Sequence, residues 1–360
     1  MVARYISRAA RKVPAALKVF LAIAVLCTAA VAQETRYPIE VEGKFGFIDS
    51  TGRVVVPPVY KAPLQFSEGF AEVTLVSFFW WYYRHVGYLG VRGDTAIDTG
   101  YQEGGRFSDG LARVRTSVLF GGGEWGFIDT AGREVIKPSF YGAGDFHDGR
   151  ARVENSSGFL WLGQVRKYGF IDRTGRLLTG FIYDGAGDFS GGMANVTVDG
   201  KRGFIDTTGK LVVGYNYETV GLFSCGLAPV ERSGKWGYIN ARGEEVIPRQ
   251  YEEARSFMDG IALVMQKGVW EFITTSGDRA FSLRFEDALG FSEGLAAVMV
   301  GGRWGYADTS GTFVIEPQFA AAEPFYQGLA AVETASQRGY IDREGKFVWS
   351  TRKPRYSVSK

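Results

Sequence analysis

The chain has 360 residues, of which 46% are hydrophobic and 15% aromatic, and this excludes an intrinsically disordered protein because a core can form. Its 41 Lys and Arg residues nearly balance its 39 Asp and Glu residues. Five of the basic residues lie in the first 32 positions, so the rest is slightly acidic and nothing in the charge points to nucleic acid.

The first 32 residues have the layout of a secretory signal peptide. Basic residues lead into the apolar run VFLAIAVLCTAAVA, which ends in small residues suited to cleavage. The run is shorter than the about 20 residues of a comfortable membrane span. We therefore predict export to the bacterial periplasm or the exterior. The alternative is an uncleaved segment, which would then be the protein's contact with a membrane. Residues 33–42 are predicted to form a linker.

From residue 43 to residue 349 one phrase recurs. It contains a Trp-Gly-like pair, and the positions of its second residue are Gly46, Gly87, Gly126, Gly169, Gly203, Gly237, Glu271, Gly305 and Gly339. The first three steps are 41, 39 and 43 residues, and every later step is 34. A second phrase, F-S-E-G, recurs with the same steps from Phe66 to Phe325. Because two independent anchors agree, the chain is predicted to be a repeat array.

Each unit is predicted to form three short strands. The first carries the Trp-Gly pair and leads into a D-x-x-G turn, such as Asp206 to Gly209, where Gly takes the left-handed position. The second strand is apolar and is predicted to end at a proline, for example at Pro138, Pro248 or Pro317. The third has the pattern G-x-A-x-V, which puts Ala and Val on one face. One unit buries too little surface alone, so neighbouring units must stack.

These phrases resemble the WG-repeat family of bacterial β-rich arrays. The segments that carry the resemblance include GKFGFIDSTG, GEWGFIDTAGREVIKPSF, GKWGYINARGEEVIPRQY and GGRWGYADTSGTFVIEPQF. The resemblance covers residues 43–349 and implies a β-repeat fold. It implies little about activity, because many members of the family have none assigned.

An open array is the expected architecture. Thirty-four residues leave room for three strands, whereas a propeller blade usually has four strands and about 40 residues. The chain closes on RGYIDREGKFVW, a hairpin without a third strand, which leaves about eight and a half units. We therefore predict an all-β open solenoid or superhelix in preference to a closed propeller. Residues 350–360 form a basic tail.

The three longer units carry their extra residues in one place, between the third strand and the next first strand. Equivalent loops of a stacked array line one edge, so we expect these three to be neighbours. They are rich in aromatic residues, and an exposed aromatic cluster usually marks a contact site. The candidate binding residues are Phe78, Phe79, Trp80, Trp81, Tyr82, Tyr83, His85, Phe120, Phe159 and Trp161. The alternative is that the loops pack on one another in a small core of their own.

No residue pattern points to catalysis. Two histidines, and Cys225 as the single cysteine beyond the signal segment, cannot form a zinc site. Hydrolase, metalloprotease and P-loop motifs are absent from the sequence. Five acids that stacking could align each precede a turn Gly, where such residues are common: Glu68, Asp109, Asp148, Asp259 and Glu293. We predict no enzymatic activity, no cofactor and no metal, although a glycosidase-like carboxylate pair stays open as an alternative.

The predicted function is an exported, non-enzymatic scaffold that binds an envelope or extracellular protein through the aromatic loops. The alternative is a glycan or cell-wall binding module in which the same aromatics stack on sugar rings. The residue before the repeat Gly varies from Trp236 to Val86 and Arg202. A sugar platform repeated along the array should be more uniform, so this variation favours protein recognition.

Overall fold

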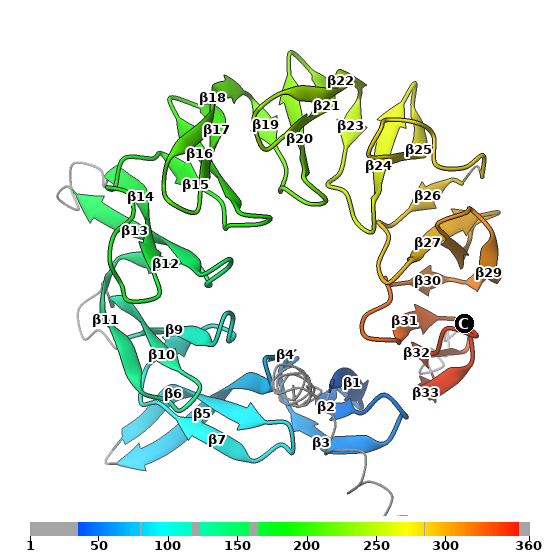
Figure 1. The fold of residues 1–360 in the computed structure, drawn as a ribbon. Helices are drawn as coiled ribbons and strands as arrows, with labels where there is room; N and C mark the ends of the chain where they lie inside the picture. The colour runs from blue at the N-terminus through cyan, green and yellow to red at the C-terminus, as the bar shows by residue number, and fades with distance from the viewer. Residues whose placement is uncertain (1–34, 80, 117–122, 158–164, 284, 353–360) are drawn as a thin grey trace, which may run out of the picture. The chain divides into compact units, whose positions relative to one another are not determined.

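The structure is a computed structural model, and it describes residues 35–79, 81–116, 123–157, 165–283 and 285–352. The chain divides before Arg36, and the repeat domain lies in the part that begins there. In its described residues the strands form nine antiparallel sheets, which follow one another as the blades of a β-propeller (Figure 1). The described residues contain no helix that could cross a membrane.

The strands are named by blade. Blades 1 to 3 contain β1 (Tyr37–Val41), β2 (Lys44–Ile48) and β3 (Val54–Tyr60); β4 (Phe66–Ser67), β5 (Phe70–Phe79), β6 (Trp81–Gly90) and β7 (Thr95–Asp98); and β8 (Glu103–Gly104), β9 (Leu111–Arg115), β10 (Trp125–Asp129) and β11 (Glu134–Phe140). Blades 4 to 6 contain β12 (Gly142–Ala143), β13 (Arg150–Ser157) and β14 (Val165–Asp172); β15 (Gly185–Ala186), β16 (Met193–Val198), β17 (Lys201–Asp206) and β18 (Leu211–Tyr217); and β19 (Thr219–Val220), β20 (Leu227–Arg232), β21 (Lys235–Asn240) and β22 (Glu245–Tyr251). Blades 7 to 9 contain β23 (Glu253–Ala254), β24 (Ile261–Gln266) and β25 (Val269–Thr274); β26 (Asp287–Ala288), β27 (Leu295–Val300), β28 (Arg303–Asp308) and β29 (Phe313–Phe319); and β30 (Ala321–Ala322), β31 (Ala330–Glu333), β32 (Gln337–Ile341) and β33 (Phe347–Arg352).

A complete blade takes its strands from two sequence units. Its inner strand has two residues, its second strand carries G-x-A-x-V, its third carries the Trp-Gly pair, and its outer strand is the apolar segment after the turn. The second strand therefore pairs with the Trp-Gly strand that follows it, as Val230 pairs with Gly237 in blade 6. The blade is one strand out of phase with the unit that the sequence suggests.

The prediction of an open solenoid of about eight and a half three-stranded units is wrong. The last hairpin, β32–β33, pairs with β31 and so completes blade 9. At the other end β1 forms within residues 33–42, which the sequence assigned to a linker. It pairs with β2 in the place of a second strand, with Ile39 opposite Gly46. With β1 counted, the described chain holds nine blades and no leftover hairpin, which is what a closed ring requires.

Strand β1 also joins the two ends of the ring. The rings of Tyr37 and Tyr340 lie 5.5 Å apart between centroids at 58°. The Tyr37 hydroxyl donates a hydrogen bond of 2.6 Å to the Gln327 carbonyl oxygen. Arg338 and Glu40 form an ion pair of 3.0 Å across the same junction. Blades 9 and 1 are therefore in direct contact.

The same aromatic contact recurs at the other blade interfaces. The aromatic residue after the repeat Gly packs on the F-S-E-G Phe of the next blade, as Tyr238 does on Phe257 at 4.8 Å between ring centroids. Eight such pairs have centroid distances of 4.7 to 5.2 Å. Each pair contributes roughly 0.5–1.5 kcal/mol beyond its burial. Tyr37 with Tyr340 is the ninth contact and closes the series.

The Gly of the Trp-Gly pair is required by a bulge in the outer strand. In blade 6 the register of β22 shifts between Ile247 and Tyr251, opposite Gly237. A Cβ atom on Gly237 would lie 2.6 Å from the Ile247 carbonyl oxygen, so a side chain does not fit. Glu271 takes this position in blade 7, where the described residues form no outer strand.

The same bulge corrects the prediction for the prolines. Pro138, Pro248 and Pro317 lie inside outer strands rather than at their ends, since β11 continues to Phe140, for example. Each sits where the register shifts, and a proline is tolerated at a bulge because its missing N–H breaks no ladder bond there.

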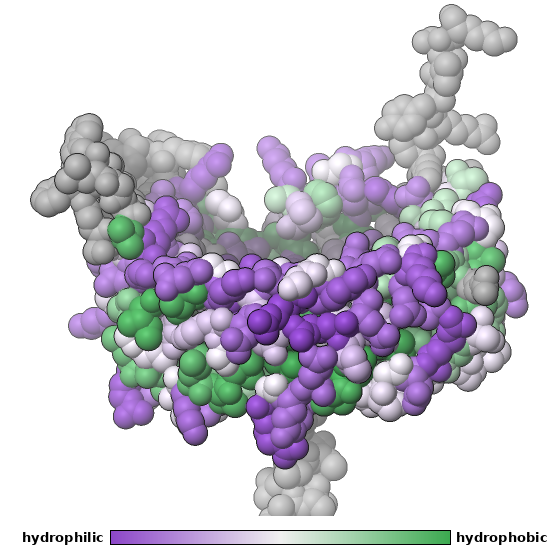
Figure 2. Space-filling model, turned by 90° about the horizontal axis from the view of Figure 1, so that it is seen from above, coloured by the Kyte–Doolittle hydropathy of each residue, from purple (hydrophilic) through white to green (hydrophobic). Residues whose placement is uncertain are grey.

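The outer strands face solvent. Figure 2 shows a band of hydrophilic side chains along the outer wall, with apolar residues beside it. The exposed apolar residues include Leu211 and Val246, from the outer strands of blades 5 and 6. Scattered exposed apolar residues of this kind are ordinary in soluble domains.

Candidate binding site on blades 2 to 4

The site arises where the inner strand of blade 2 is displaced: β4 pairs only with Phe70 and Ala71, which leaves the edge of residues 72–74 open. In blades 3 to 9 an inner strand begins ten residues after a turn Gly, as β12 begins ten residues after Gly132 and β30 ten residues after Gly311. The same count from Gly52 leads to Ala62 and Pro63, which belong to no strand. The proline ring holds φ near −65°, whereas an antiparallel strand has about −140°. Residues 61–65 therefore leave the edge of β5.

A cavity of about 830 Å³ fills the resulting space. Its wall is formed by residues 59–65, by Glu72, Val73 and Thr74 of β5, and by residues of blades 3 and 4. This volume lies within the range of about 300–1,000 Å³ that is typical of ligand sites. The three neighbouring blades thus share one opening at their inner edge.

Charged side chains from blades 3 and 4 line the cavity. Arg113 Nε lies 3.1 Å from Asp145 Oδ1, and Arg106 Nε lies 3.4 Å from Asp145 Oδ2. The Asp145 side chain is 11% exposed, whereas both arginines are far more exposed. Arg113 also donates a 2.7 Å hydrogen bond to the Ala143 carbonyl oxygen. These contacts fix the carboxylate and leave guanidinium groups facing the cavity.

Glu72 is the acid on the opposite wall. Its side chain is exposed to the cavity, but protein surrounds it on several sides, and this desolvation raises the pKa of its carboxyl group. Arg113 partly offsets the rise, while Asp145 and Glu103 add to it. No hydrogen bond or ion pair joins the Glu72 carboxylate to another described residue.

The residue between Ala and Val of the second strand faces the next blade, and its chemistry divides the ring. In blades 2 to 5 it is polar or charged: Glu72, Arg113, Arg152 and Asn195. In blades 6 to 9 it is apolar: Pro229, Leu263, Ala297 and Ala331. Leu263 and Ala297 are buried in hydrophobic clusters. The charged residues at this position of the second strand therefore belong to blades 2, 3 and 4.

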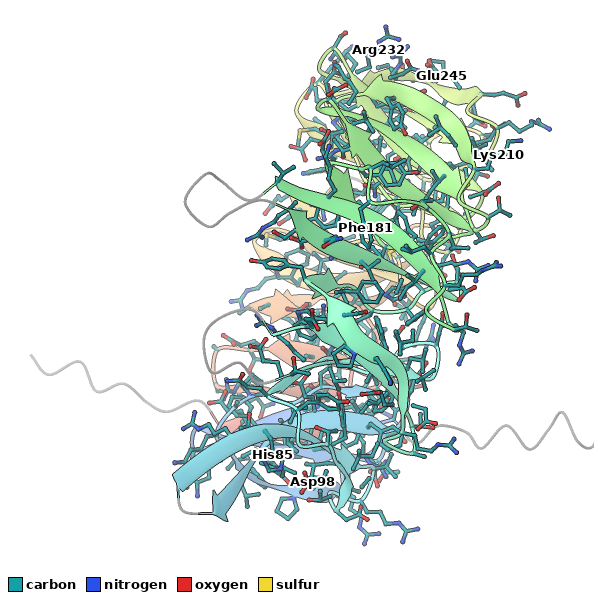
Figure 3. The ribbon with its side chains drawn as sticks, turned by 90° about the vertical axis from the view of Figure 1, so that its left-hand side faces the viewer. His85, Asp98, Phe181, Lys210, Arg232 and Glu245 are labelled. Carbon is teal, nitrogen blue, oxygen red and sulfur yellow. The ribbon has the colours of Figure 1, made fainter. Side chains whose placement is uncertain are left out.

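The three enlarged connectors belong to the same arc. They are the turns between β5 and β6, β9 and β10, and β13 and β14, in consecutive blades 2, 3 and 4. The β5–β6 hairpin has the longest strands of the three, with ten residues each, and Figure 3 shows it projecting from the edge of the ring. Thr74 of the cavity wall and the base of this hairpin lie on the same strand, so the cavity opens beside the hairpin.

In the sequence the aromatic candidates belong to these connectors. The backbones of Phe78, Phe79, Trp81, Tyr82 and Tyr83 belong to β5 and β6, but their side chains lie outside the described part. Trp80, Phe120, Phe159 and Trp161 lie wholly outside the described residues. The structure thus places the strands that flank these candidates in neighbouring blades, and the contacts of the candidate side chains lie outside the described part.

His85 was predicted to be a binding residue, but it is buried. It is 4% exposed, and its Nε2 lies 2.7 Å from Asp98 Oδ1 of β7 (Figure 3). The imidazole therefore joins β6 to the outer strand of blade 2 and is not available to a partner.

The five turn acids are structural links between blades. Each has a left-handed backbone, with φ between 51° and 55°. Each carboxylate also accepts a hydrogen bond from a turn Gly N–H of the next blade, as Asp109 does from Gly149 at 2.7 Å and Asp148 from Gly192 at 2.9 Å. Sequence reasoning identified the turn but missed the link. Within the described residues no three His, Cys, Asp or Glu side chains gather as a metal site.

The cavity was missed because its signals are local departures from the repeat. The sequence shows Pro63 at a position where other blades form an inner strand. It also shows Glu72 between the Ala and Val that recur in every repeat. Their meaning depends on the existence of an inner strand, which the three-strand interpretation did not include.

Comparison with known proteins identifies the repeat. The sequence profile described as "WG containing repeat" matches residues 45–75, 125–157, 168–201, 203–236, 236–270, 272–304 and 304–335. No curated protein matches the chain.

Several solved structures are similar at low identity. Apo AztD from Citrobacter koseri has 12% identity and a TM-score of 0.40, over 89% of this chain and 94% of that one. The protein lmo1340 from Listeria monocytogenes EGD-e has 11% identity and a TM-score of 0.36, over 72% and 98%. The extracellular domain of BT3049 from B. thetaiotaomicron has 9% identity and a TM-score of 0.30, over 89% and 56%. At these TM-scores the likeness carries no argument about function.

Proposed function

The chain belongs to the WG-repeat family, and from this premise we propose that it is an exported, non-catalytic scaffold that binds another protein through blades 2 to 4. The observation that carries the proposal is the concentration of irregular features on one arc. The open edge of β5, the cavity, the charged residues between Ala and Val of the second strand and the three enlarged hairpins all belong to these blades. Blades whose only task is to close the ring have no need of them.

The chemistry of the arc suits a protein partner. A protein interface needs aromatic and Arg side chains at its centre and charged groups near its rim. The β5–β6 hairpin supplies an aromatic sequence, and Arg106 and Arg113 supply guanidinium groups beside it. The signal-like segment of residues 1–32 supports an envelope or extracellular location, where the partner would also be found.

Cross-linking with mass spectrometry on envelope and culture fractions tests this function. The test variant replaces residues 77–83 with Asp-Gly, which keeps Val76 opposite Arg84 as the last pair. This copies the short hairpin of blade 5, where Val198 pairs with Lys201 around Asp199-Gly200. Stopping at residue 83 leaves the buried His85 in place.

The matched control is Asp199→Asn, which keeps a two-residue turn on blade 5. We expect the shortened hairpin to lose a specific cross-linked protein that the unchanged chain and the control retain. Identical cross-links with all three proteins would refute the contact site. Capture of oligosaccharides by the unchanged chain on a glycan array, with no protein cross-linked, would favour glycan binding instead.

A further inference from the structure

We infer that the open edge of β5 beside Glu72, Val73 and Thr74, beyond the pairing with β4, accepts an extended peptide segment of the partner. The segment pairs with these three residues and sets a basic side chain beside Glu72. This inference rests on the proposed protein-binding function and names the form that the partner takes at one point.

The other blades show what occupies this position. In blade 4 the inner segment donates two backbone hydrogen bonds of 2.9 Å, from Tyr141 to the Glu154 carbonyl and from Gly144 to the Arg152 carbonyl. The corresponding bonds occur in blade 9, from Ala320 to Glu333 at 2.7 Å and from Glu323 to Ala331 at 2.9 Å. A short extended segment is therefore the natural partner of a second strand at its inner edge.

The equivalent carbonyl groups of blade 2 belong to Thr74 and Glu72. No backbone N–H of residues 61–65 donates to either of them, because that segment has left the strand edge. An unpaired strand edge is a template for another chain, and adding a strand to such an edge is a common mode of peptide recognition. The cavity of about 830 Å³ lies at this edge.

A second strand edge is open in blade 1. The described residues of blade 1 contain no inner strand, and a cavity of about 270 Å³ lies between β1 and blade 9. That volume is below the typical range for ligand sites, and the Tyr340 hydroxyl already donates to the Pro38 carbonyl there at 2.7 Å. The larger opening of blade 2 is therefore the better acceptor.

The charges give the peptide its side-chain preference. In blades 3 and 4 the residue equivalent to Glu72 is Arg113 or Arg152, and each pairs with an aspartate of the next blade at 3.1 or 2.9 Å. In blade 2 the two charges are exchanged. Glu72 takes the place of the arginine, and Arg106 takes the place of the aspartate. Arg106 turns to Asp145 instead, so Glu72 keeps no ion pair with a described residue. A Lys or Arg of the peptide would supply one.

The position next to Glu72 on an inserted segment is spacious. Its equivalents in blades 3 and 4 are Gly105 and Gly144, and a Cβ there would meet the Arg113 or Arg152 side chain within 2.5 to 2.8 Å. Glu72 is shorter than arginine and lies beside the open cavity. A longer peptide side chain is therefore accommodated in blade 2 where glycine is needed in blades 3 and 4.

Selection from a phage-displayed library of random peptides tests the inference. The targets are the unchanged chain, Pro63→Ala and Glu72→Gln, each first shown to be folded by circular dichroism and thermal unfolding. Pro63→Ala lets residues 61–65 return to the strand edge and fill the position. Glu72→Gln keeps the edge and removes the charge.

We expect the unchanged chain to enrich peptides with a Lys or Arg, and the selected peptide to slow amide hydrogen exchange at residues 72–74. Pro63→Ala should lose this binding, and Glu72→Gln should bind the same peptide about tenfold more weakly. A failure to enrich peptides, or equal binding to Pro63→Ala without protection of residues 72–74, would overturn the inference. The hairpin-dependent cross-linking described above would be unaffected by that result, so the scaffold function and this site can fail separately.

Discussion

Closure of the ring through Tyr37 makes a quantitative prediction. Tyr37 is 3% exposed, packs on Tyr340 and donates a hydrogen bond to the Gln327 carbonyl. Truncating a buried aromatic residue to Ala costs about 3–5 kcal/mol. Removing the hydroxyl alone costs about 1 kcal/mol, because the carbonyl loses its donor. We therefore expect Tyr37→Ala to lower the free energy of unfolding by about 4 kcal/mol and Tyr37→Phe by about 1 kcal/mol.

The magnitude distinguishes a ring from an open array. In an array the end unit contacts one neighbour, so losing a terminal contact lets that unit fray at small cost to the rest. In a ring blade 1 contacts blade 9 as well as blade 2, and loss of the contact affects the whole domain. A variant in the middle of the ring provides the reference: Phe223→Ala removes the equivalent contact with Phe204, whose ring centroid is 4.8 Å away.

Urea unfolding, followed by tryptophan fluorescence, measures the free energy of unfolding. Hydrogen exchange shows which strands open. We expect Tyr37→Ala and Phe223→Ala to shift the unfolding midpoint similarly, and exchange to accelerate in β33 as well as in β1. A loss below about 1 kcal/mol for Tyr37→Ala, with faster exchange confined to β1, would refute closure by this contact.

Three further outcomes follow from the repeat. Gly237→Ala should destabilise by about 1–3 kcal/mol in urea unfolding, because its methyl group would lie 2.6 Å from the Ile247 carbonyl oxygen. In the exposed turn of blade 4, hydrogen bonding by Thr174 lowers the pKa of Asp172, so this carboxylate stabilises the fold above the unfolded pKa of about 4 and the effect is lost as the pH falls through the folded pKa. Asp172→Asn should weaken the pH dependence of the unfolding midpoint below about pH 4, and an unchanged acid profile would contradict the assignment. Burial raises the pKa of Tyr340 to about 12, so its contribution is present below the unfolded pKa of about 10 and is lost as the pH rises through about 12; Tyr340→Phe should remove this part of the alkaline transition, as measured by phenolate absorbance.

The repeat itself could be predicted because its chemistry is local. The D-x-x-G turn forms as expected, with Asp206 accepting from the Thr208 and Lys210 amides. The buried Ala and Val of the second strand also lie where alternation places them, as Ala228 and Val230 do in blade 6. These features depend on a few neighbouring residues, which is why one sequence suffices to recognise them.

The ring was not predictable from the repeat because its closure uses residues outside the pattern. The segment of β1 reads YPIEV and has neither the G-x-A-x-V phrase nor the F-S-E-G Phe. Tyr37 packs on Tyr340 in the role that the F-S-E-G Phe has at the other blade interfaces, although it lies at a different position in its blade. A pattern search ends where the repeat ends, whereas the fold requires only a strand with an aromatic side chain at that point.

The energetics of strand pairing explain how blade 2 can leave the edge of residues 72–74 open. The two hydrogen bonds forgone by residues 61–65 are worth about 1 kcal/mol each. Ordering each residue of the segment would cost about 1–2 kcal/mol of backbone entropy. For five residues this entropy cost is at least as large as the gain from two hydrogen bonds, so the ring can keep an open edge at little cost to its stability.

The same balance limits what a peptide can gain at this edge. An incoming segment pays ordering entropy for a similar pair of backbone bonds, so the ion pair with Glu72 must supply much of the net affinity. A lone peptide should accordingly bind weakly. A whole partner that also contacts the β5–β6 hairpin would hold the segment at high effective concentration, because the hairpin rises from the same strand as Thr74. The open edge and the enlarged hairpin are thus two parts of one interface, and their adjacency on β5 is what makes a weak strand pairing sufficient.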